Sequence, residues 1–123
     1  MKYIQTDKAP QAIGPYSQAV SVNGMLYTSG QIALTSDGVM LENNIDAQTH
    51  QVLQNLSEVL QEAGSSLSKV VKTTIFLDSM DDFVVVNRIY EQYFQNHKPA
   101  RATVAVKTLP KNALVEIDAI AII

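Results

Sequence analysis

The chain has 123 residues, of which 46% are hydrophobic and 17% are charged, as is usual for a globular protein with one modest core. A net charge of −3 without any cluster of Lys or Arg argues against a nucleic-acid partner, and the absence of cysteine excludes disulfides, thiolate nucleophiles and cysteine-bound metals. Because no segment has the apolar length of a signal peptide or a membrane span, we expect a cytoplasmic protein with no membrane partner and a single domain over residues 1–123.

The first predicted element is a β-hairpin. Residues 18–22 and 23–34 are rich in residues such as Val, Ile, Thr and Tyr that favour strands. Asn23 and Gly24 stand between these two segments, and this dipeptide is the strongest short signal for a two-residue hairpin turn.

A long helix is predicted next, because apolar residues recur at spacings of three and four along one stripe. Asn43 or Asn44 is suited to cap the start of this helix, and Gly64 is suited to the left-handed position that follows its end. The stripe comprises Ile45, Thr49, Val52, Leu53, Leu56, Val59, Leu60 and Ala63.

A strand over residues 69–77 and a second helix follow. Asp81 or Asp82 is suited to the first turn of this helix, and Pro99 limits how far it can continue. The apolar stripe of the second helix comprises Phe83, Val86, Asn87, Tyr90 and Phe94.

The last two predicted strands, residues 101–106 and 113–123, are separated by a turn at Pro110, so they are expected to form a second hairpin. The element order is then β-β-β-α-β-α-β-β, which favours an α+β fold of two layers, a sheet with both helices on one face. Residues 69–77 and 114–123 are apolar on both faces, and exposed apolar sheet of that size is rare on monomers. The second face is therefore expected to pack against other subunits, which predicts an oligomer.

The motifs of several enzyme classes are absent. His50 and His97 are the only histidines and lack the spacing of metal ligands, so no metal site is expected. Nucleotide-binding motifs are missing, and Ser29 lies in TSGQ rather than in a nucleophile elbow. Asn87 is more informative, because an amide on an apolar helix stripe must find hydrogen-bond partners. It is expected to hold a nearby backbone segment such as residues 99–103, either as a purely structural bond or as part of a site.

Arg101 and Glu116 are charges within otherwise apolar strands, where burial is costly without a partner. Arg can bind a carboxylate through two parallel hydrogen bonds, and a Glu in a partly apolar pocket has a raised pKa and can act as acid or base. The alternative is a structural ion pair between the hairpin strands. A turn centred near Pro110 would place the two charges ~10 Å apart on opposite faces. A shift of one residue would place them on the same face, and the sequence leaves both registers open.

Six segments together resemble the Rid family of reactive intermediate deaminases, also called YjgF-type, in its imine deaminase branch. The resemblance covers essentially the whole chain in the family's order: IGPYSQA (13–19), TSGQI (28–32), VVKTTIFL (70–77), VNRIYEQYF (86–94), KPAR (98–101) and LVEIDAIA (114–121). It implies a chorismate-mutase-like α+β fold with a mixed six-stranded sheet, and a homotrimer with three sites in clefts between subunits. The implied activity is hydrolysis of 2-imino acids, or of enamine tautomers such as 2-aminoacrylate, to 2-oxo acids and ammonia without a cofactor.

The resemblance also assigns roles to individual residues. Arg101 matches the arginine that binds the substrate carboxylate, and Glu116 matches the glutamate proposed to activate the attacking water. Tyr16 matches a tyrosine that closes over the ligand, from the adjacent subunit. The remaining matches are substrate-binding positions: Ser29 and Gly30 in the SGQ turn, Asn87, which is expected to hold the backbone of the site, and Thr103, whose neighbouring backbone carbonyl is expected to accept the iminium N–H.

Two departures from the family pattern touch the predicted site. Ala102 and Thr103 stand where many relatives have Ser-Cys, and Asp118 stands where Glu is common. A contact made through backbone would survive the first change. Two other functions remain open: a non-catalytic sensor of 2-oxo or amino acids, and a nuclease or translation inhibitor. The negative net charge and the lack of a basic patch argue against a nuclease or translation inhibitor.

Overall fold

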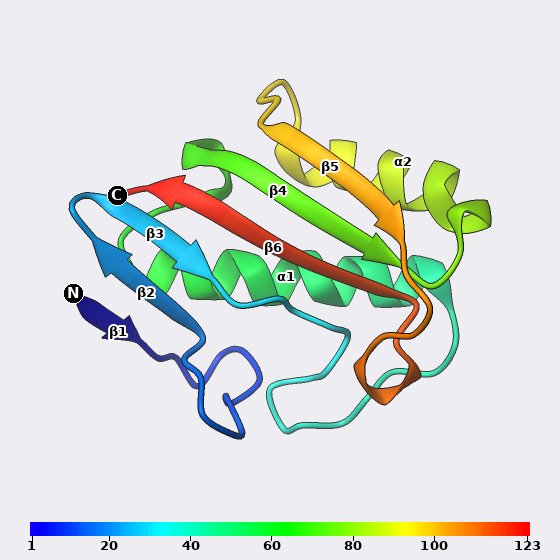
Figure 1. Ribbon diagram of the computed structural model, residues 1–123. Coiled ribbons are helices and arrows are strands. Elements are labelled where there is room, and N and C mark those ends of the chain that lie inside the picture. Colours follow the sequence, from blue (N-terminus) through cyan, green and yellow to red (C-terminus); the bar gives the residue numbers. More distant parts are fainter.

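The computed structural model describes residues 1–123 as one six-stranded sheet with two α-helices (Figure 1). In chain order the elements are β1 (Lys2–Ile4), β2 (Ala19–Val22), β3 (Met25–Thr28), α1 (Ile45–Glu62), β4 (Val70–Leu77), α2 (Phe83–Phe94), β5 (Ala100–Ala105) and β6 (Val115–Ile122). Short 3-10 helices span η1 (Leu67–Lys69), η2 (Met80–Asp82) and η3 (Pro110–Asn112). The α+β class and the predicted element order are confirmed.

Two details at the N-terminal side differ from the prediction. β1 lies ahead of the segments that looked β-like. β3 ends at Thr28, whereas the prediction extended this strand to Leu34. Beyond Thr28 the chain leaves the sheet and keeps only an isolated antiparallel bridge between Gln31 and Ile117.

The strands are ordered β1-β2-β3-β6-β4-β5, and every neighbouring pair is antiparallel except β4 and β5. The first predicted hairpin is confirmed, since β2 and β3 pair directly. Its turn residues, Asn23 and Gly24, have φ angles of 51° and 76°. Left-handed conformation at both central residues is what a type I′ turn requires, which explains the Asn-Gly pair.

The hairpin predicted for the last two strands is wrong. β5 pairs in parallel with β4, and β6 lies between β3 and β4. The connection between β5 and β6 straddles the end of β4: the N–H of Val106 donates to the carbonyl of Leu77 at 2.9 Å, and the N–H of Asp78 donates to the carbonyl of Leu114 at 3.0 Å. A crossover unit is formed by β4, α2 and β5, and its two parallel strands lie side by side. The more apolar β6 then takes the position between β3 and β4.

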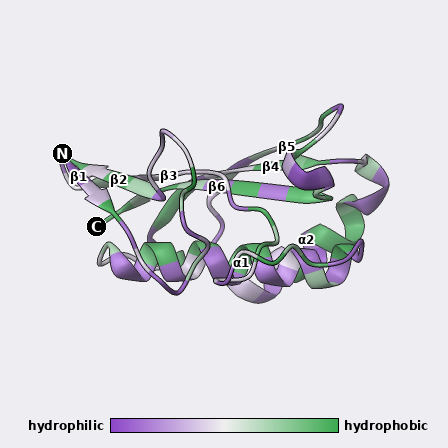
Figure 2. Cartoon of the chain, turned by 90° about the horizontal axis from the view of Figure 1, so that it is seen from below, coloured by the Kyte–Doolittle hydropathy of each residue, from purple (hydrophilic) through white to green (hydrophobic).

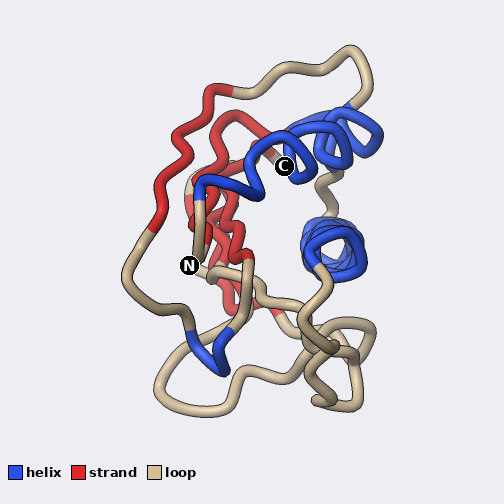
Figure 3. Tube along the Cα trace, turned by 90° about the vertical axis from the view of Figure 1, so that its right-hand side faces the viewer, coloured by secondary structure: helices blue, strands red, loops and turns tan.

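Both helices cover the same face of the sheet, as predicted (Figure 2 and Figure 3). The core lies between these two layers. Its fully buried side chains include Leu26, Leu53, Leu56, Leu60, Ile75, Leu77, Ile89 and Ile117. Neither helix is both long and apolar enough to cross a membrane.

The stripe predicted for α1 points into this core. Its members from Thr49 to Leu60 are buried, and those at the two ends are partly buried. Asn44 caps the helix, because its Oδ1 accepts a hydrogen bond from the N–H of Ala47 at 2.9 Å. Gly64 follows the end of the helix with a φ of 83°, the left-handed conformation that the sequence predicted.

α2 follows its prediction less closely at its ends. Asp82 occupies the position before the first turn but makes no capping hydrogen bond with its side chain. The helix ends at Phe94, where Gln95 adopts a φ of 56°, so the chain leaves the helix well before Pro99.

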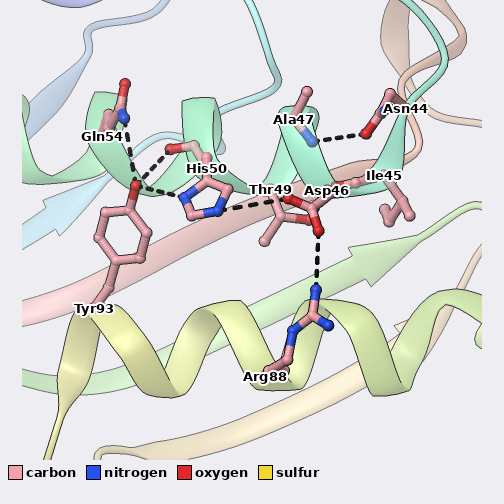
Figure 4. Close-up of polar contacts among 9 residues, drawn as sticks. All are labelled: Asn44, Ile45, Asp46, Ala47, Thr49, His50, Gln54, Arg88 and Tyr93. Carbon is pink, nitrogen blue, oxygen red and sulfur yellow. Dashed lines mark hydrogen bonds and ion pairs between the residues drawn. The ribbon is translucent and has the colours of Figure 1, made fainter.

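Polar side chains join the outer surfaces of α1 and α2 (Figure 4). Arg88 donates to Asp46 at 2.9 Å, and the hydroxyl of Tyr93 lies 3.0 Å from Nδ1 of His50. Such exposed contacts each add little stability, but together they link α2 to the longer helix beside it. This matters for function because α2 carries one side of the predicted site.

No helix covers the opposite face of the sheet, which is called the open face below. A row of paired residues crosses it through all six strands: Tyr3, Val20, Tyr27, Ile120, Lys72 and Ala100. Tyr3 is 69% exposed and Ile122, on the same face, is 49% exposed. Apolar side chains on both faces are thus confirmed, and the open face also carries polar side chains such as Lys72. The burial of the open face by other copies stays a prediction.

Candidate functional site

Five of the seven predicted site residues, all but Ser29 and Thr103, lie in two separate clefts of the chain. The arginine cleft, of about 280 Å³, lies between α2 and the start of β5 and is lined by Asn87, Tyr90, Glu91, Phe94, Gln95, His97, Lys98, Pro99 and Arg101. The glutamate cleft, of about 310 Å³, is lined by Pro10, Gln11, Ala12, Ile13, Tyr16, Gln18, Gly30, Gln31, Ile32, Leu34, Pro110, Lys111 and Glu116. No three His, Asp or Glu side chains gather as metal ligands in either cleft or elsewhere.

The guanidinium of Arg101 is held only by uncharged groups. Its Nη1 donates a 2.7 Å hydrogen bond to Oδ1 of Asn87. Its carbon Cζ lies 4.9 Å from the ring centre of Tyr90 and 5.7 Å from that of Phe83, both within the range of a cation–π contact. The ion pairs of the chain are those of Asp46 with His50 and Arg88, so Arg101 has no carboxylate partner. Its charge and most of its N–H groups therefore remain free for an anionic ligand.

Asn87 was expected to hold the backbone of residues 99–103, and this detail is wrong. The amide bonds the side chain of Arg101 instead. The bond is possible because α2 lies beside β5 (Figure 1), and Asn87 of the helix thereby reaches the side chain of Arg101. The expectation that Asn87 must find a polar partner is confirmed.

Thr103 lies on β5, two residues beyond Arg101 and therefore on the same side of the strand. It lines neither of the two clefts. Its Oγ1 is buried without a hydrogen-bond partner, which is unusual for a hydroxyl. The backbone role predicted at this position stays a prediction.

Glu116 lies on β6 and points to the open face, as the alternation with buried Val115 and Ile117 requires. Burial raises its pKa, and the carboxylate of Asp118, two residues along the same face, raises it further. A carboxyl group with a raised pKa is a stronger base than an ordinary glutamate and is suited to accept a proton from water.

Gly30 lies directly against the side chain of Glu116. A Cβ atom at this position would lie 2.8 Å from Cδ of Glu116, so no larger residue fits without displacing the carboxyl group. The backbone of Gly30 is not left-handed, which means that space rather than φ demands glycine here. Tyr16 lines the same cleft and is 55% exposed.

Ser29 supports the loop that carries Tyr16. Its hydroxyl donates to the carbonyl of Ser17 at 2.5 Å, and its N–H donates to the carbonyl of Gln18 at 2.9 Å. Ser29 is not among the residues that line the glutamate cleft, so the structure places it behind the loop rather than at the cleft surface.

Arg101 and Glu116 are far apart within one chain. Arg101 pairs with Thr73 of β4, and Glu116 pairs with Phe76 of the same strand, from its other side. The charges are therefore two strands and three residues apart, roughly 10 Å in each direction. An odd number of residues along β4 also places them on opposite faces of the sheet. The structural ion pair considered from the sequence is excluded, because it relied on a hairpin that does not form.

Several residues that build the clefts were missed in the sequence. Buried amides fix the loops around the glutamate cleft: Gln18 donates to the carbonyl of Pro10 at 2.8 Å, and Asn55 donates to the carbonyl of Leu34 at 2.8 Å. Asn55 and Gln48 share the inward face of α1, so the reasoning applied to Asn87 could have found them. The ring contacts of Arg101 had no local signal, because they depend on how β5 pairs.

The fold and the two clefts define a two-layer α+β protein with a free arginine on one face and a carboxyl group of raised pKa on the other. The sequence model of the family described as Endoribonuclease L-PSP matches residues 6–123. The chain belongs to this family, which includes the Rid proteins that its sequence resembles.

Individual relatives agree over almost the whole length. A Mus musculus protein named 2-iminobutanoate/2-iminopropanoate deaminase is 49% identical, with 98% of this chain and 90% of the relative covered. The crystal structure of a protein of unknown function from Yersinia pestis, described as a member of the conserved Rid family, is 52% identical and superimposes with a TM-score of 0.97 over 99% of this chain and 98% of that chain. The crystal structure of E. coli TdcF with bound serine is 37% identical, with a TM-score of 0.95 and both chains covered completely.

Proposed function

We propose that this protein hydrolyses 2-imino acids such as 2-iminopropanoate and 2-iminobutanoate, and their enamine tautomers such as 2-aminoacrylate, to 2-oxo acids and ammonia. The 49% identity to a mouse protein named for that substrate class supports the proposal. The observation that carries it is the state of Arg101, whose guanidinium is held by an amide and two rings and has no carboxylate partner. Such a charge is suited to the carboxylate that every 2-imino acid carries.

We also propose that each site forms between two copies of the chain, in a homotrimer with three sites. The arginine cleft of one subunit would face the glutamate cleft of the next, with Tyr16 and Gly30 contributed beside Glu116. Two observations support this arrangement: the two charges lie on opposite faces of one sheet, and the open face exposes large apolar side chains such as Tyr3 and Ile122 without a helix over them. A head-to-tail interface that closes into a ring joins one patch of each subunit to a different patch of its neighbour.

The reaction needs little beyond orientation and proton transfer, because an iminium carbon is already electrophilic. Arg101 fixes the substrate carboxylate, and a backbone carbonyl near Thr103 accepts an N–H of the iminium group. As a water oxygen bonds to the iminium carbon, Glu116 takes the proton that the water loses. The same proton then passes to the amine nitrogen, the C–N bond breaks and ammonia leaves. The carbinol O–H gives its proton to Glu116 as its oxygen becomes the carbonyl of the 2-oxo acid, and Glu116 then releases this proton to solvent. No cofactor takes part.

A coupled assay tests the proposal. A serine/threonine dehydratase generates the enamine while semicarbazide competes for the imine, with and without the protein. Wild type is expected to suppress the semicarbazone, whereas Arg101→Ala is expected to lose this effect. Arg88→Ala is the matched control, because Arg88 is an exposed arginine whose partner is Asp46 on the outer surface of the helices. If folded wild-type protein leaves the semicarbazone unchanged, the deaminase proposal fails.

A second candidate function is a non-catalytic sensor of small amino or 2-oxo acids. The relative TdcF, whose structure holds serine, favours it, because serine has no C=N bond to hydrolyse. The two functions separate at Glu116→Gln. A sensor is expected to keep its affinity and its cellular effect in this variant, whereas an enzyme keeps affinity and loses rate.

A further inference from the structure

Tyr90 stands beneath the guanidinium of Arg101 and is itself fixed at both ends. Its ring stacks on that of Phe94, with centres 4.4 Å apart and planes inclined by 25°. Its hydroxyl lies 2.8 Å from the hydroxyl of Thr73, which is completely buried on β4. Thr73 is also the direct strand partner of Arg101. Thr73 thus fixes Arg101 in two ways. Strand pairing holds the backbone of Arg101, and the bond between hydroxyls holds the Tyr90 ring that lies beneath its guanidinium.

We propose that Tyr90, anchored by Thr73, is a positioning residue that sets the orientation of the Arg101 guanidinium for the substrate carboxylate. The inference rests on the proposed function and adds to it two residues that act on the substrate through Arg101. Asn87 occupies one N–H of the guanidinium, and the aromatic face of Tyr90 limits the tilt of its plane. The two contacts together restrict the directions in which the remaining N–H groups can point.

Neutral contacts serve this purpose better than an acidic partner would. A carboxylate beside Arg101 would orient it equally well, but it would compete with the carboxylate of the substrate for the same N–H groups. Burial raises the pKa of the Tyr90 hydroxyl, although the bond to Thr73 and the charge of Arg101 act in the opposite direction. The phenol therefore stays neutral at the pH of the reaction, and the ring supplies a π face rather than a competing anion.

The first test compares five variants in the coupled assay. Tyr90→Leu removes the ring and is expected to raise KM about three- to thirtyfold while kcat changes less than about threefold. Tyr90→Phe keeps the ring and is expected to restore most of that loss. Thr73→Val leaves the Tyr90 hydroxyl buried without its hydrogen-bond partner. Thr73→Val combined with Tyr90→Phe removes both hydroxyls, so its KM is expected to be no higher than that of either single variant. Tyr93→Leu is the matched control, since Tyr93 is on the same helix and bonds His50 on the outer surface.

The second test does not depend on catalysis. The Nε–H of Arg101 lies near an aromatic ring, so its proton resonance is expected to carry a ring-current shift that Tyr90→Phe keeps and Tyr90→Leu loses. Titration with 2-oxobutanoate is expected to move this resonance and to show the same loss of affinity in Tyr90→Leu as KM does. If wild type binds 2-oxobutanoate at Arg101 but hydrolyses no imine, the deaminase proposal fails and the positioning role stands.

Two results would overturn the positioning role. One is an unchanged Arg101 resonance and an unchanged affinity in Tyr90→Leu. The other is an equal loss of affinity in Tyr90→Phe, Tyr90→Leu and Tyr93→Leu that follows their melting temperatures, which would reduce Tyr90 to a packing residue.

Discussion

The arginine cleft and the glutamate cleft are built in opposite ways. The first lies between a helix and a strand, and Arg101 is oriented by residues of regular secondary structure. The second is formed mostly by loops, which buried amides such as Gln18 and Asn55 hold in place. The charge of Arg101 is left free by neutral neighbours, whereas burial and Asp118 act on Glu116 to favour its protonated form. One cleft is suited to binding an anion and the other to moving a proton.

In the proposed function, neither cleft is a complete site by itself. Binding and proton transfer must act on the same small molecule, yet the two groups lie on opposite faces of one sheet. Two copies of the chain can bring both clefts together without any change in the fold of either copy. The predictions below test this division of tasks, from the largest expected effect to the smallest.

Glu116→Gln should separate proton transfer from binding most clearly. We expect kcat to fall about 10²- to 10⁴-fold, as is usual for loss of a general base, while 2-oxobutanoate still binds. The free energy of unfolding should rise in this variant, although the rate falls. Because the folded state raises the pKa of Glu116, ionisation of this carboxyl group lowers stability. The cost is absent below the ordinary pKa of a glutamate, grows as the pH rises toward the raised pKa of the folded state, and is fully present above it. The variant should thus melt higher than wild type at pH 7, with a difference that shrinks toward acidic pH. Equal loss of binding and rate would contradict the division between the clefts.

Mixing two inactive variants should show whether a site takes one cleft from each of two copies. Arg101→Ala and Glu116→Gln chains are unfolded together and refolded, so that their subunits assort at random. About a quarter of the sites then receive an intact arginine from one chain and an intact glutamate from another, and activity should return to about that fraction of wild type. A mixture of Arg101→Ala with the double variant serves as control and should stay inactive. If the first mixture is equally inactive, sites shared between copies are ruled out.

Gly30→Ala should affect the glutamate cleft and leave the arginine cleft intact. The added Cβ would overlap the carboxyl group of Glu116, so we expect a loss of stability of about 1–3 kcal/mol and a ten- to hundredfold lower kcat. Thermal unfolding of a double variant provides the control. If the overlap with Glu116 is the cause, Gly30→Ala combined with Glu116→Ala should melt like Glu116→Ala alone.

The sequence predicted the parts of the fold that depend on local patterns. The stripes on both helices, the Asn44 cap and the Asn23-Gly24 hairpin follow from spacing and turn chemistry within a few residues. The place of β6 does not, because two strands that follow each other through a turn such as Pro110 ordinarily pair. Nothing local shows that β4 will lie between β5 and β6.

The same limit applies to the candidate site. Arg101, Glu116 and Asn87 stand out in the sequence because a polar residue in an apolar run needs a partner, and the structure gives Arg101 and Asn87 to each other. Which face a strand residue points to depends on pairing between distant segments. The separation of Arg101 and Glu116 into two clefts could therefore not be predicted from the sequence. Tyr90 was correctly predicted on the inward stripe, but its ring meets Arg101 only because β5 runs parallel to β4 above α2.

Asp118→Asn should have the smallest effect and should act on the glutamate cleft alone. Burial is the main cause of the raised pKa of Glu116, and the Asp118 carboxylate contributes the lesser part. Removal of that charge should therefore lower the pKa of Glu116, so that the acidic limb of the pH–rate profile moves to lower pH. At a pH well above this limb, where Glu116 is ionised in both proteins, the rate should change less than about twofold. Affinity for 2-oxobutanoate should change little, since Asp118 does not line the glutamate cleft. An acidic limb that stays in place would mean that a group other than Glu116 controls the pH dependence.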